Sequence, residues 1–556
     1  MSLPEFSTQS ELFSTAGCSR ELFPPTDRYR LFARKVYPVL AQARTKLEAC
    51  YCTDNGRVAV EPVLLMGVSL LQYLEGVPDR QAVEMLQYHA GWNFALNRHV
   101  GDGLFHPTTL VNFRQRMVAH DLSAIGFQAV LDALIAAGLV ARKSRQRLDS
   151  TQMMGRVSRM SRLDCVRESL RLALQELAES LPEAQRPAWW SELWDNYVES
   201  QTDYRASLET LARKMAEAGK AAQQVLGWLA DASDQKLAQA KQAQLLARVF
   251  EEQFEVVPGA SDAQSKTKEQ LSSERVQNPH DPDATYACKG RGEQCKEHVG
   301  YKVQVAETVT EAVLESGEPT QNFIVGVVTH AARESDEEGA CKMEAEQQAM
   351  GLEKPPVQYV DAAYVSTDKL VEAKAEGREL IGPAPQSGGP NRERFQSDDF
   401  HVEVEQRQAT CPAGHHSSQC SRLVEKATGK VSFRLEWDTA TCGSCPLRLK
   451  CIKAEHKHRT LVVGEHHTLL QARRTEQQTD EFKARLKHRN AIEGTQSELV
   501  RAHGMRRTRY RGLAKAKLQN YLAAAACNVK RWLRRVVWEM RQDLAALAAN
   551  VAPAAN

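Results

Sequence analysis

Apolar positions recur at helical spacing through the first quarter of the chain and give way later to strand-like alternation. In residues 21–140 apolar side chains return every three or four positions, which predicts short helices joined by turns. The clearest of these predicted helices cover residues 60–74, 79–86 and 106–117. Pro62 stands in the first turn of the first one, where proline is tolerated because its missing N–H has no helical partner.

The third predicted helix is the most basic of this group, with Arg114 and Arg116 on its body and Thr108 or Thr109 as the expected N-cap. Short helices ending in a basic one suit a helix-turn-helix-like module that contacts DNA. A plain helical bundle with ordinary surface arginines fits the pattern equally well. Residues 1–20 precede these helices and are expected to form a flexible leader.

Strand-like patterns appear around residue 149 and again after residue 276. Strands are expected at residues 300–306, 323–329, 357–360 and 379–382, and helices at residues 338–351 and 367–375. Periodicity by itself therefore indicates a mixed α/β fold. Its expected parts are residues 141–157, 276–387 and 471–540.

Two insertions interrupt this α/β pattern. Residues 158–275 are rich in Leu, Ala, Glu, Gln and Lys, which predicts a helical hairpin or small bundle. Its tryptophans (Trp189, Trp190, Trp194 and Trp228) are expected in a core, since a ligand-stacking role is the rarer use. Residues 261–278 are polar and predict a linker. The second insertion covers residues 388–470 and opens on Gly388-Gly389-Pro390-Asn391.

Composition sets the class of protein. The chain has 556 residues, which favours more than one domain, and 42% apolar residues, enough to bury cores. Its net charge is only +2, with acidic residues crowded between Glu307 and Glu346 and basic ones toward the end, so any polyanion-binding surface must be local. No transmembrane helix or signal peptide is expected, and the compartment is predicted to be the cytosol.

The cysteine spacing predicts a metal site in the second insertion. The chain has 13 cysteines, and Cys442-Gly443-Ser444-Cys445 is a C-x-x-C knuckle with Cys451 six residues on and Cys411 upstream. This set fits a structural tetrahedral zinc ion, with Cys420, His415 or His416 as substitutes. Free buried thiols are the alternative.

Three carboxylates stand out as candidate chemistry. Glu493 lies in a basic helical segment with Arg489 one turn before it, Asp149 follows a basic run, and Asp361 ends an apolar run. An exposed helix with ordinary ion pairs would also explain Glu493 on its own. Asp281 and Asp283, before the second strand, are either solvated turn residues or the rivals of Asp149.

In chain order these residues form an Asp, Asp, Glu series, and here the chain resembles the DDE transposases of bacterial insertion sequences with an InsH-like N-terminal domain. The resemblance extends roughly from Arg20 to Arg535. Its most specific parts are the Arg489-to-Glu493 spacing, the following Gly-Met-Arg-Arg…Tyr-Arg-Gly, and the Tyr-Val-Asp-Ala-Ala-Tyr segment around Asp361. Two positions depart from the family pattern: Leu486 and Val500 stand where relatives often carry Tyr and Lys.

The resemblance implies a ribonuclease H-like core and a helical N-terminal domain that contacts transposon DNA. It implies that Asp149, Asp361 and Glu493 bind two Mg²⁺ (or Mn²⁺) ions for hydrolysis of DNA ends and strand transfer. The expected DNA contacts are Arg489, Arg501, Arg506, Arg507, Arg509, Tyr510 and Arg511, with Arg114 and Arg116 in the N-terminal domain. Cysteine patterns in such transposases support zinc at Cys411, Cys442, Cys445 and Cys451.

The expected partners are double-stranded transposon-end and target DNA and at least one further copy of the chain, since two ends are cut together. No membrane partner is expected, and the location implied is the bacterial cytoplasm, at the nucleoid. Two other functions stay open: a DNA-binding protein of transposase descent that no longer cuts, and a structural protein built on the helical insertion. Residues 541–556 are expected to be a tail.

Overall fold

The computed structural model describes residue 3 and residues 21–52, 58–99, 102–200, 207–231, 235–256, 263–289, 295–311, 314–384, 394–426, 429–453 and 455–551. The expected leader lies outside these residues except for residue 3, and so does the Gly388–Asn391 opening of the second insertion.

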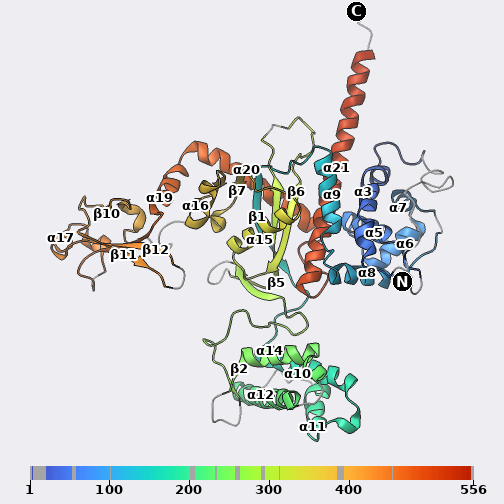
Figure 1. Ribbon diagram of the computed structural model, residues 1–556, viewed down its shortest axis with the longest axis horizontal. Coiled ribbons are helices and arrows are strands. Elements are labelled where there is room, and N and C mark those ends of the chain that lie inside the picture. The colour runs from blue at the N-terminus through green and yellow to red at the C-terminus, as the bar shows by residue number, and fades with distance from the viewer. Residues whose placement is uncertain are drawn as a thin grey trace, which may run out of the picture.

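A six-stranded mixed sheet lies at the centre of the molecule (Figure 1). Its strands are β1 (Gln146–Met154), β4 (Thr285–Lys289), β5 (Lys296–Thr308), β6 (Ile324–Ala331), β7 (Val357–Tyr359) and β8 (Glu379–Ile381). β5 runs antiparallel to β1, β4 and β6, whereas β7 runs parallel to both β1 and β8. β1 is therefore flanked by β5 and β7, away from the edges.

The helices α15 (Asp336–Ala349), α20 (Asp480–Ala502) and α21 (Leu513–Val551) pack on this sheet. α15 begins with a capping box in which Ser335 and Glu338 exchange side-chain and backbone hydrogen bonds. α16 (Thr367–Ala375) connects β7 to β8, as the parallel pairing of those strands requires.

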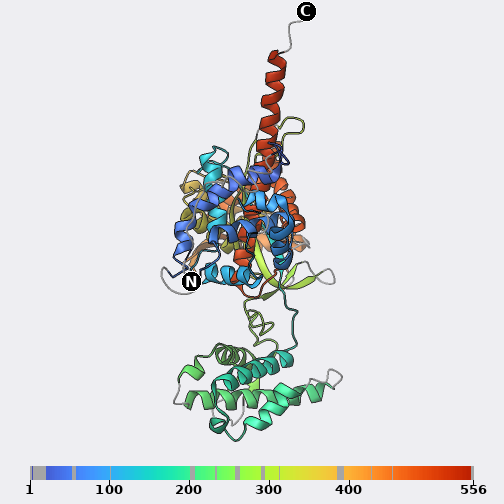
Figure 2. The same cartoon turned by 90° about the vertical axis from the view of Figure 1, so that its right-hand side faces the viewer.

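α21 joins the N-terminal helices to the sheet. These helices are α2 (Arg28–Leu31), the π-helix η1 (Phe32–Val36), α3 (Tyr37–Gln42), α4 (Arg44–Glu48), α5 (Pro62–Glu75), α6 (Asp79–Tyr88), α7 (Ala90–Ala95), α8 (Thr108–Ala119) and α9 (Ile125–Ala136). Ala523–Ala526 of α21 are fully buried. Their small side chains let the neighbouring elements pack close to the axis of the helix. One continuous hydrophobic core consequently runs from Tyr29 to Leu533, across the predicted boundary at residue 140. Beyond this core α21 projects from the body (Figures 1 and 2).

The helical insertion forms a separate body with its own core (Figures 1 and 2). Its main elements are α10 (Arg162–Ser180), α11 (Trp190–Trp194), α12 (Leu208–Asp231), α13 (Gln235–Ala238) and α14 (Lys241–Gln253), followed by the short hairpin of β2 (Phe254–Glu255) and β3 (Gln264–Ser265). Trp190 is buried in this core and the other three tryptophans pack against it.

The cysteine-rich insertion is a small β structure on the opposite side of the sheet from the N-terminal helices (Figure 1). It contains the pair β9 (His401–Glu403) and β10 (Gln408–Thr410), the sheet β11 (Gln419–Val424), β12 (Val431–Glu436) and β13 (Thr460–Gly464), and the short helices α17 (Thr439–Gly443) and α18 (Arg448–Cys451). Phe400, Leu435 and Trp437 form its core. α19 (His467–Glu476) leads back to α20.

The mixed α/β class and all the strands and helices expected between residues 300 and 382 are confirmed. One expected detail is wrong: the N-cap of α8 is Pro107, without a side-chain cap, and Thr108 is the first helical residue. The ring of Pro107 fixes its φ at −52°, close to the helical value, so the helix begins one residue before a threonine could cap it. None of the helices in the described ranges combines the length and apolarity needed to span a membrane.

Candidate active site

Asp149 lies on the middle strand of the sheet. It belongs to β1, whose first four residues, Asp149 included, are buried. One carboxylate oxygen accepts the N–H of Ser150 at 2.8 Å. Burial raises the pKa of Asp149, and the negative charges of Asp361 and Asp336 raise it further. A buried carboxylate with a raised pKa is typical of a functional site.

The register of two parallel strands brings Asp361 beside Asp149. Gln146 pairs with Gln358 and Arg147 with Tyr359. Continued by two residues, the same register sets Asp149 level with Asp361, and neighbouring strands lie about 4.8 Å apart. Asp361 lies two residues after the last residue of β7 and caps the 3₁₀ turn η5 (Ala362–Tyr364), where its Oδ1 accepts the N–H of Ala363 at 2.8 Å.

Arg489 of α20 contacts all three candidate carboxylates. Its Nη2 lies 3.1 Å from Oδ2 of Asp149 and 3.8 Å from Oδ2 of Asp361. Its Nη1 lies 3.7 Å from Oε1 of Glu493, four residues later on the same helix. Residues separated by hundreds of positions in the sequence therefore converge on one guanidinium.

The charges of this group do not balance. Three carboxylates surround a single guanidinium, which leaves two negative charges uncompensated among these four side chains when all of them are ionised. The buried Nε of Arg489 has no hydrogen-bond partner in the described residues. Carboxylate oxygens are the ligands that hard divalent cations prefer, so the donor set suits one or two such ions. Glu493 is 69% exposed, which leaves its oxygens accessible.

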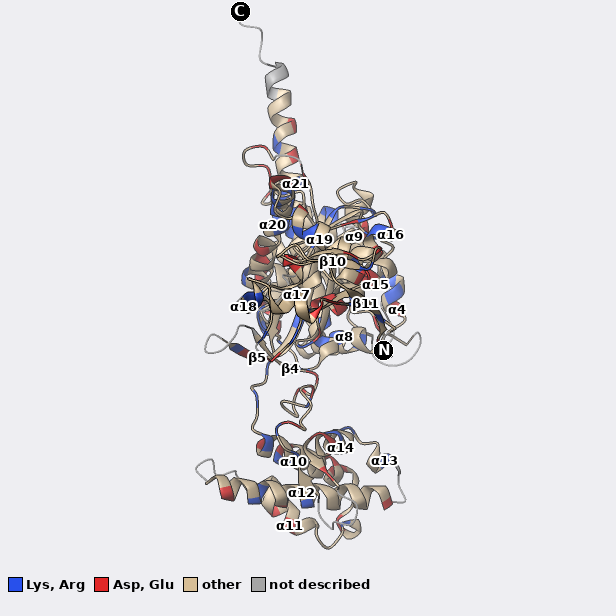
Figure 3. Ribbon diagram, turned by 90° about the vertical axis from the view of Figure 1, so that its left-hand side faces the viewer, with Lys and Arg blue, Asp and Glu red and all other residues tan. Residues whose placement is uncertain are grey.

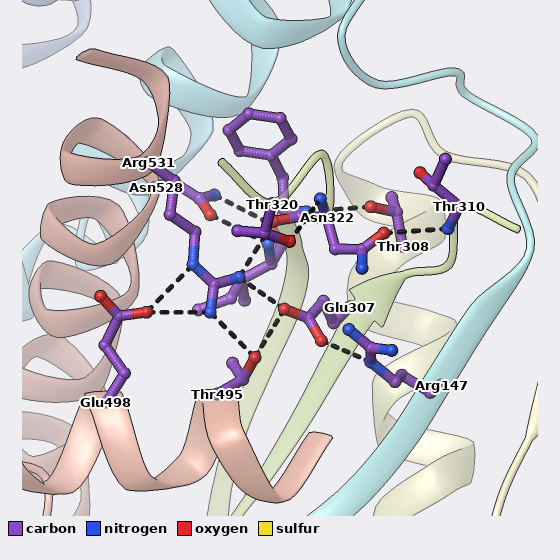
Figure 4. Close-up of polar contacts among 12 residues, drawn as sticks. Arg147, Glu307, Thr308, Thr310, Thr320, Asn322, Thr495, Glu498, Asn528 and Arg531 are labelled. Atoms are coloured by element: carbon purple, nitrogen blue, oxygen red, sulfur yellow. Dashed lines mark hydrogen bonds and ion pairs between the residues drawn. The ribbon is translucent and has the colours of Figure 1, made fainter. Parts of the chain in front are cut away.

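A buried ion-pair network holds α20 against the sheet (Figure 4). Glu307 of β5 is its centre: it accepts from Nε of Arg147 at 2.5 Å and from Oγ1 of Thr495 at 2.6 Å. Arg147 also donates from Nη1 to the carbonyl of His488 at 3.1 Å. Since His488 adjoins Arg489 and Thr495 lies two residues after Glu493, both ends of the site-bearing turn are fixed.

The same network extends to α21. Arg531 donates to Glu307, and its Nη2 donates to Oγ1 of Thr495 at 2.8 Å and to Glu498 at 3.0 Å. Burial by itself would raise the pKa of Glu498, but hydrogen bonds and charge from Lys530 and Arg531 outweigh it and bring the pKa to about 2. Sequence reasoning missed Glu307 and Thr495. A single acid between buried residues of a strand, in Val305-Ala306-Glu307, was the available signal.

The basic segment after α20 runs beside the end of β1. The N–H of Met154 donates to the carbonyl of Arg506 at 3.0 Å, and Thr508 donates back to Met154 at 2.9 Å. The side chains of Arg501, Arg506, Arg507 and Arg511 are exposed. Arg509 is half-buried, with its guanidinium 5.0 Å from the centre of the Tyr73 ring.

The arginines of α8 have internal partners. Arg114 is only 5% exposed, is paired with Asp79, and lies 5.5 Å over the ring of Tyr510. Burial keeps the guanidinium of Arg114 from solvent, and it ties the N-terminal helices to the basic segment. The DNA contact expected of Arg114 stays a prediction. Arg116 is half-buried and lies 4.7 Å over Tyr51. Tyr510 packs between these elements and is half-buried.

Asp281 and Asp283, the rivals of Asp149, contact the start of α21. Asp281 is fully buried, and its Oδ1 accepts from the hydroxyl of Tyr301 at 2.6 Å and from the N–H of Gly512 at 3.0 Å. Asp283 accepts the N–H of Leu513 at 2.9 Å. Two carboxylates at a helix N-terminus satisfy its free N–H groups. Of these three aspartates, it is Asp149 that contacts Arg489.

The four predicted zinc ligands surround one small cavity in the cysteine-rich insertion. Cys411, Cys442, Cys445 and Cys451 line it. Burial raises the pKa of Cys451, and the nearby thiols raise it further. Such a thiolate set would suit zinc. In the described residues no three of these sulfurs lie within 4.8 Å of one another, so the side chains would have to close around an ion.

The substitutes proposed for these ligands differ in position. His415 lines the same cavity, and its carbonyl accepts from the indole N–H of Trp437 at 2.9 Å. Cys420 lies on β11 and His416 bonds Thr410 at 3.0 Å, and neither lines the cavity.

Two family models match the chain. One is described as a transposase DDE domain and matches residues 410–533, which include Glu493 and the segment that follows it. The other is described as a transposase domain (DUF772) and matches residues 18–116, within the N-terminal helices. No curated protein matches the chain significantly.

Proposed function

Since the two matched domains indicate an insertion-sequence DDE transposase, we propose that the chain binds the ends of its own element and cuts and joins DNA there. Asp149, Asp361 and Glu493 are the proposed catalytic residues. The observation that carries this assignment is the convergence of all three carboxylates on Arg489.

The strand order supports a ribonuclease H-like core. β1 is flanked on one side by antiparallel β5 and on the other by parallel β7 and β8, with β6 beyond β5. In this arrangement Asp149 of β1, Asp361 just after β7 and Glu493 of α20 all lie within 4 Å of the Arg489 guanidinium. Leu486, a departure from the family pattern, packs with Phe482 against the β7 side of the sheet, so its apolar side chain has a structural use.

The residues of the site fit the metal ions that this chemistry requires. Two Mg²⁺ or Mn²⁺ ions held by shared carboxylates would supply an activated water and a stabilised leaving oxygen for phosphodiester hydrolysis and strand transfer. Arg489 presents a guanidinium beside the carboxylates, where it would hold a DNA phosphate in a bidentate contact. Four exposed arginines of the segment after α20 would contact the DNA backbone: Arg501, Arg506, Arg507 and Arg511. Arg509, which is half-buried, would lie beside this contact.

Other parts of the chain complete the proposal. The cysteine-rich insertion would hold structural zinc through Cys411, Cys442, Cys445 and Cys451. The N-terminal helices would contact DNA, with Arg116 more accessible than buried Arg114. At least two copies would assemble on the two ends, in the bacterial cytoplasm at the nucleoid.

The test is cleavage of a duplex carrying the flanks of the protein's own gene, with Mg²⁺ or Mn²⁺. Wild type should cut at discrete ends, and Glu493→Gln should abolish cutting while leaving DNA binding. Glu481→Gln is the matched control, because Glu481 is exposed in the first turn of the same helix. If wild type and both variants bind DNA in a salt-sensitive way and none of them cuts it, a non-cutting DNA-binding protein is favoured. Absence of salt-sensitive binding would favour a structural role.

A further inference from the structure

Two connecting segments, residues 155–161 and 275–284, join the helical insertion to the sheet, and we call them the neck (Figures 2 and 3). They are tied to each other. The N–H of Met160 donates to the carbonyl of Gln277 at 3.1 Å, and the Asn278 side chain donates to the carbonyl of Ser158 at 2.9 Å. The neck is therefore a defined structure rather than two independent linkers.

A cavity of about 280 Å³ lies where the neck meets the insertion. It is polar and basic, and its lining includes Arg159, Ser161, Arg162, Gln253, Arg275 and Gln277. Ser161 is also the N-cap of α10, where its side chain accepts the N–H of Asp164. The positive end of this 19-residue helix consequently adds to the charge of the three arginines.

Two of these arginines lack a counter-ion. Arg162 donates to the side-chain oxygen of Gln253 at 2.8 Å, and Arg275 donates to the carbonyl of Ser272 at 3.0 Å. In the part of the chain that the structure describes, neither of them forms an ion pair. The nearby acid Glu252 is engaged by Arg248 and by the N–H of Val276.

Burial lowers the pKa of Arg162, and the repulsion between these two cations, Arg162 and Arg275, lowers it further. Buried Arg531 shows the opposite case, since Glu307 and Glu498 compensate it. A half-buried pair of uncompensated guanidinium groups around a cavity is relieved by an anion, and planar guanidinium groups match phosphate geometry.

A basic route connects this cavity with the candidate active site. The segment 506–508 bonds to the end of β1, as described above. Arg156 of the neck donates to the carbonyl of Arg509 at 2.6 Å, and Arg511 lies 3.4 Å from the ring of His280. From Asp149 along β1 and the neck to Arg159 the chain covers ten residues, which span at most about 33 Å at an extended 3.3 Å per residue. That length corresponds to at most about ten base pairs of B-form DNA.

We propose that the neck cavity is a phosphate-binding site, in which Arg162 and Arg275 hold a backbone phosphate of the DNA within about ten base pairs of the cleaved bond. This inference rests on the proposed function for its partner, and it assigns the helical insertion a role in gripping DNA. Free phosphate shares the same chemistry. The route of exposed arginines from the active site favours DNA as the source.

The test compares Arg275→Gln with Arg213→Gln in the full-length chain. Arg213 is an exposed arginine of α12 in the same insertion, so each variant removes one positive charge. Arg275→Gln should reduce the slope of log Kd against log salt concentration by about one and weaken DNA binding about tenfold. Arg213→Gln should change neither. Arg275→Lys, which keeps the charge, should retain the slope.

A hydroxyl-radical footprint places the contact. On a Glu493→Gln background the protected region should extend up to about ten base pairs beyond the cleavage position, and Arg275→Gln should remove only its far end. Unchanged slope and footprint in Arg275→Gln, with cleavage intact in the otherwise wild-type chain, would overturn the neck site alone. Wild-type protein that fails to bind DNA would overturn the proposed function as well.

Inorganic phosphate distinguishes the two sources of the ligand. If orthophosphate at submillimolar concentration raises the melting temperature of wild type but not of Arg275→Gln, while the two proteins share one DNA salt slope, the cavity serves a free anion. That result would overturn DNA as the source. A salt slope that differs between them, with no such stabilisation by orthophosphate, supports it.

Discussion

Glu307 offers the sharpest test of how the site is held in place, because one carboxylate connects three elements. It bonds Arg147 on β1, Thr495 on α20 and Arg531 on α21 (Figure 4). Glu307→Gln keeps the size of the side chain and removes its charge. The amide that replaces one carboxylate oxygen cannot accept from an arginine, so one cation loses its partner.

The expected cost follows from burial. The side chains of Glu307 and Arg147 are 1% and 5% exposed. Removing one partner of a buried ion pair costs about 3–5 kcal/mol, because the remaining charge is left without compensation. Arg531 retains Glu498, which places the estimate toward the lower end, at about 3 kcal/mol. Glu297→Gln on the same strand is the control: its pair with Arg159 is 56% and 47% exposed and contributes about 0–1 kcal/mol.

Hydrogen exchange measured by mass spectrometry on peptides from α20 and β1 reports this loss of stability at the two elements that Glu307 connects. A loss of about 3 kcal/mol corresponds to roughly a hundredfold fall in protection where exchange reports the opening equilibrium. DNA cleavage should fall with it, since Arg489 and Glu493 lie on the loosened turn, and metal concentration should not restore it. Protection in α20 that matches the Glu297→Gln protein within about threefold would refute the reasoning.

Three further outcomes follow. Asp361→Asn should abolish end cleavage while DNA affinity stays within about twofold, because the substitution removes a proposed metal ligand and no cation; cleavage assays and binding titrations on the same duplex check this, and retained cutting would remove Asp361 from the site. Glu498 has a pKa of about 2, below its ordinary 4.5, so it stabilises the folded state by about 3 kcal/mol above pH 4.5 and loses this contribution as the pH falls toward 2. Glu498→Gln should therefore make the free energy of unfolding depend less on pH between 4.5 and 2. An unchanged pH dependence would contradict the ion pair. Cys442→Ser should lower the zinc content of purified protein and make residues 394–464 more sensitive to protease, whereas Cys420→Ser should leave both unchanged; equal zinc in both variants would count against the cavity as the metal site.

Local sequence patterns were sufficient to predict a strand or a helix wherever the residues of that element alone determine it. The alternation around residues 300–306 and the helical spacing around residues 367–375 reappear as β5 and α16, because apolar periodicity indicates the type of element. It did not indicate that residues 300–306 of β5 are buried on both faces of the sheet. The same holds for Asp361, which stands at the end of an apolar run and is delivered at the end of β7.

Side-chain assignments that depend on distant partners could not be read in this way. Arg114 has the residue type and helix position of a DNA contact, yet Asp79 and Tyr510, far away in the chain, bury it. Asp281 and Asp149 look alike as acids near strands. Only the fold shows that the first binds the start of α21 and the second faces Arg489.

The sequence by itself determined the mixed α/β class, the two insertions as patterns, and the three carboxylates and four cysteines as candidates. Tertiary structure decided which groups share a site, because convergence depends on the parallel register of β1 with β7 and on the seating of α20. It also decided that Glu307 supports that site and that Arg162 and Arg275 face one cavity. Charges at such separations in sequence interact only when the folded chain brings them within a few ångströms, where burial makes each unpaired one costly.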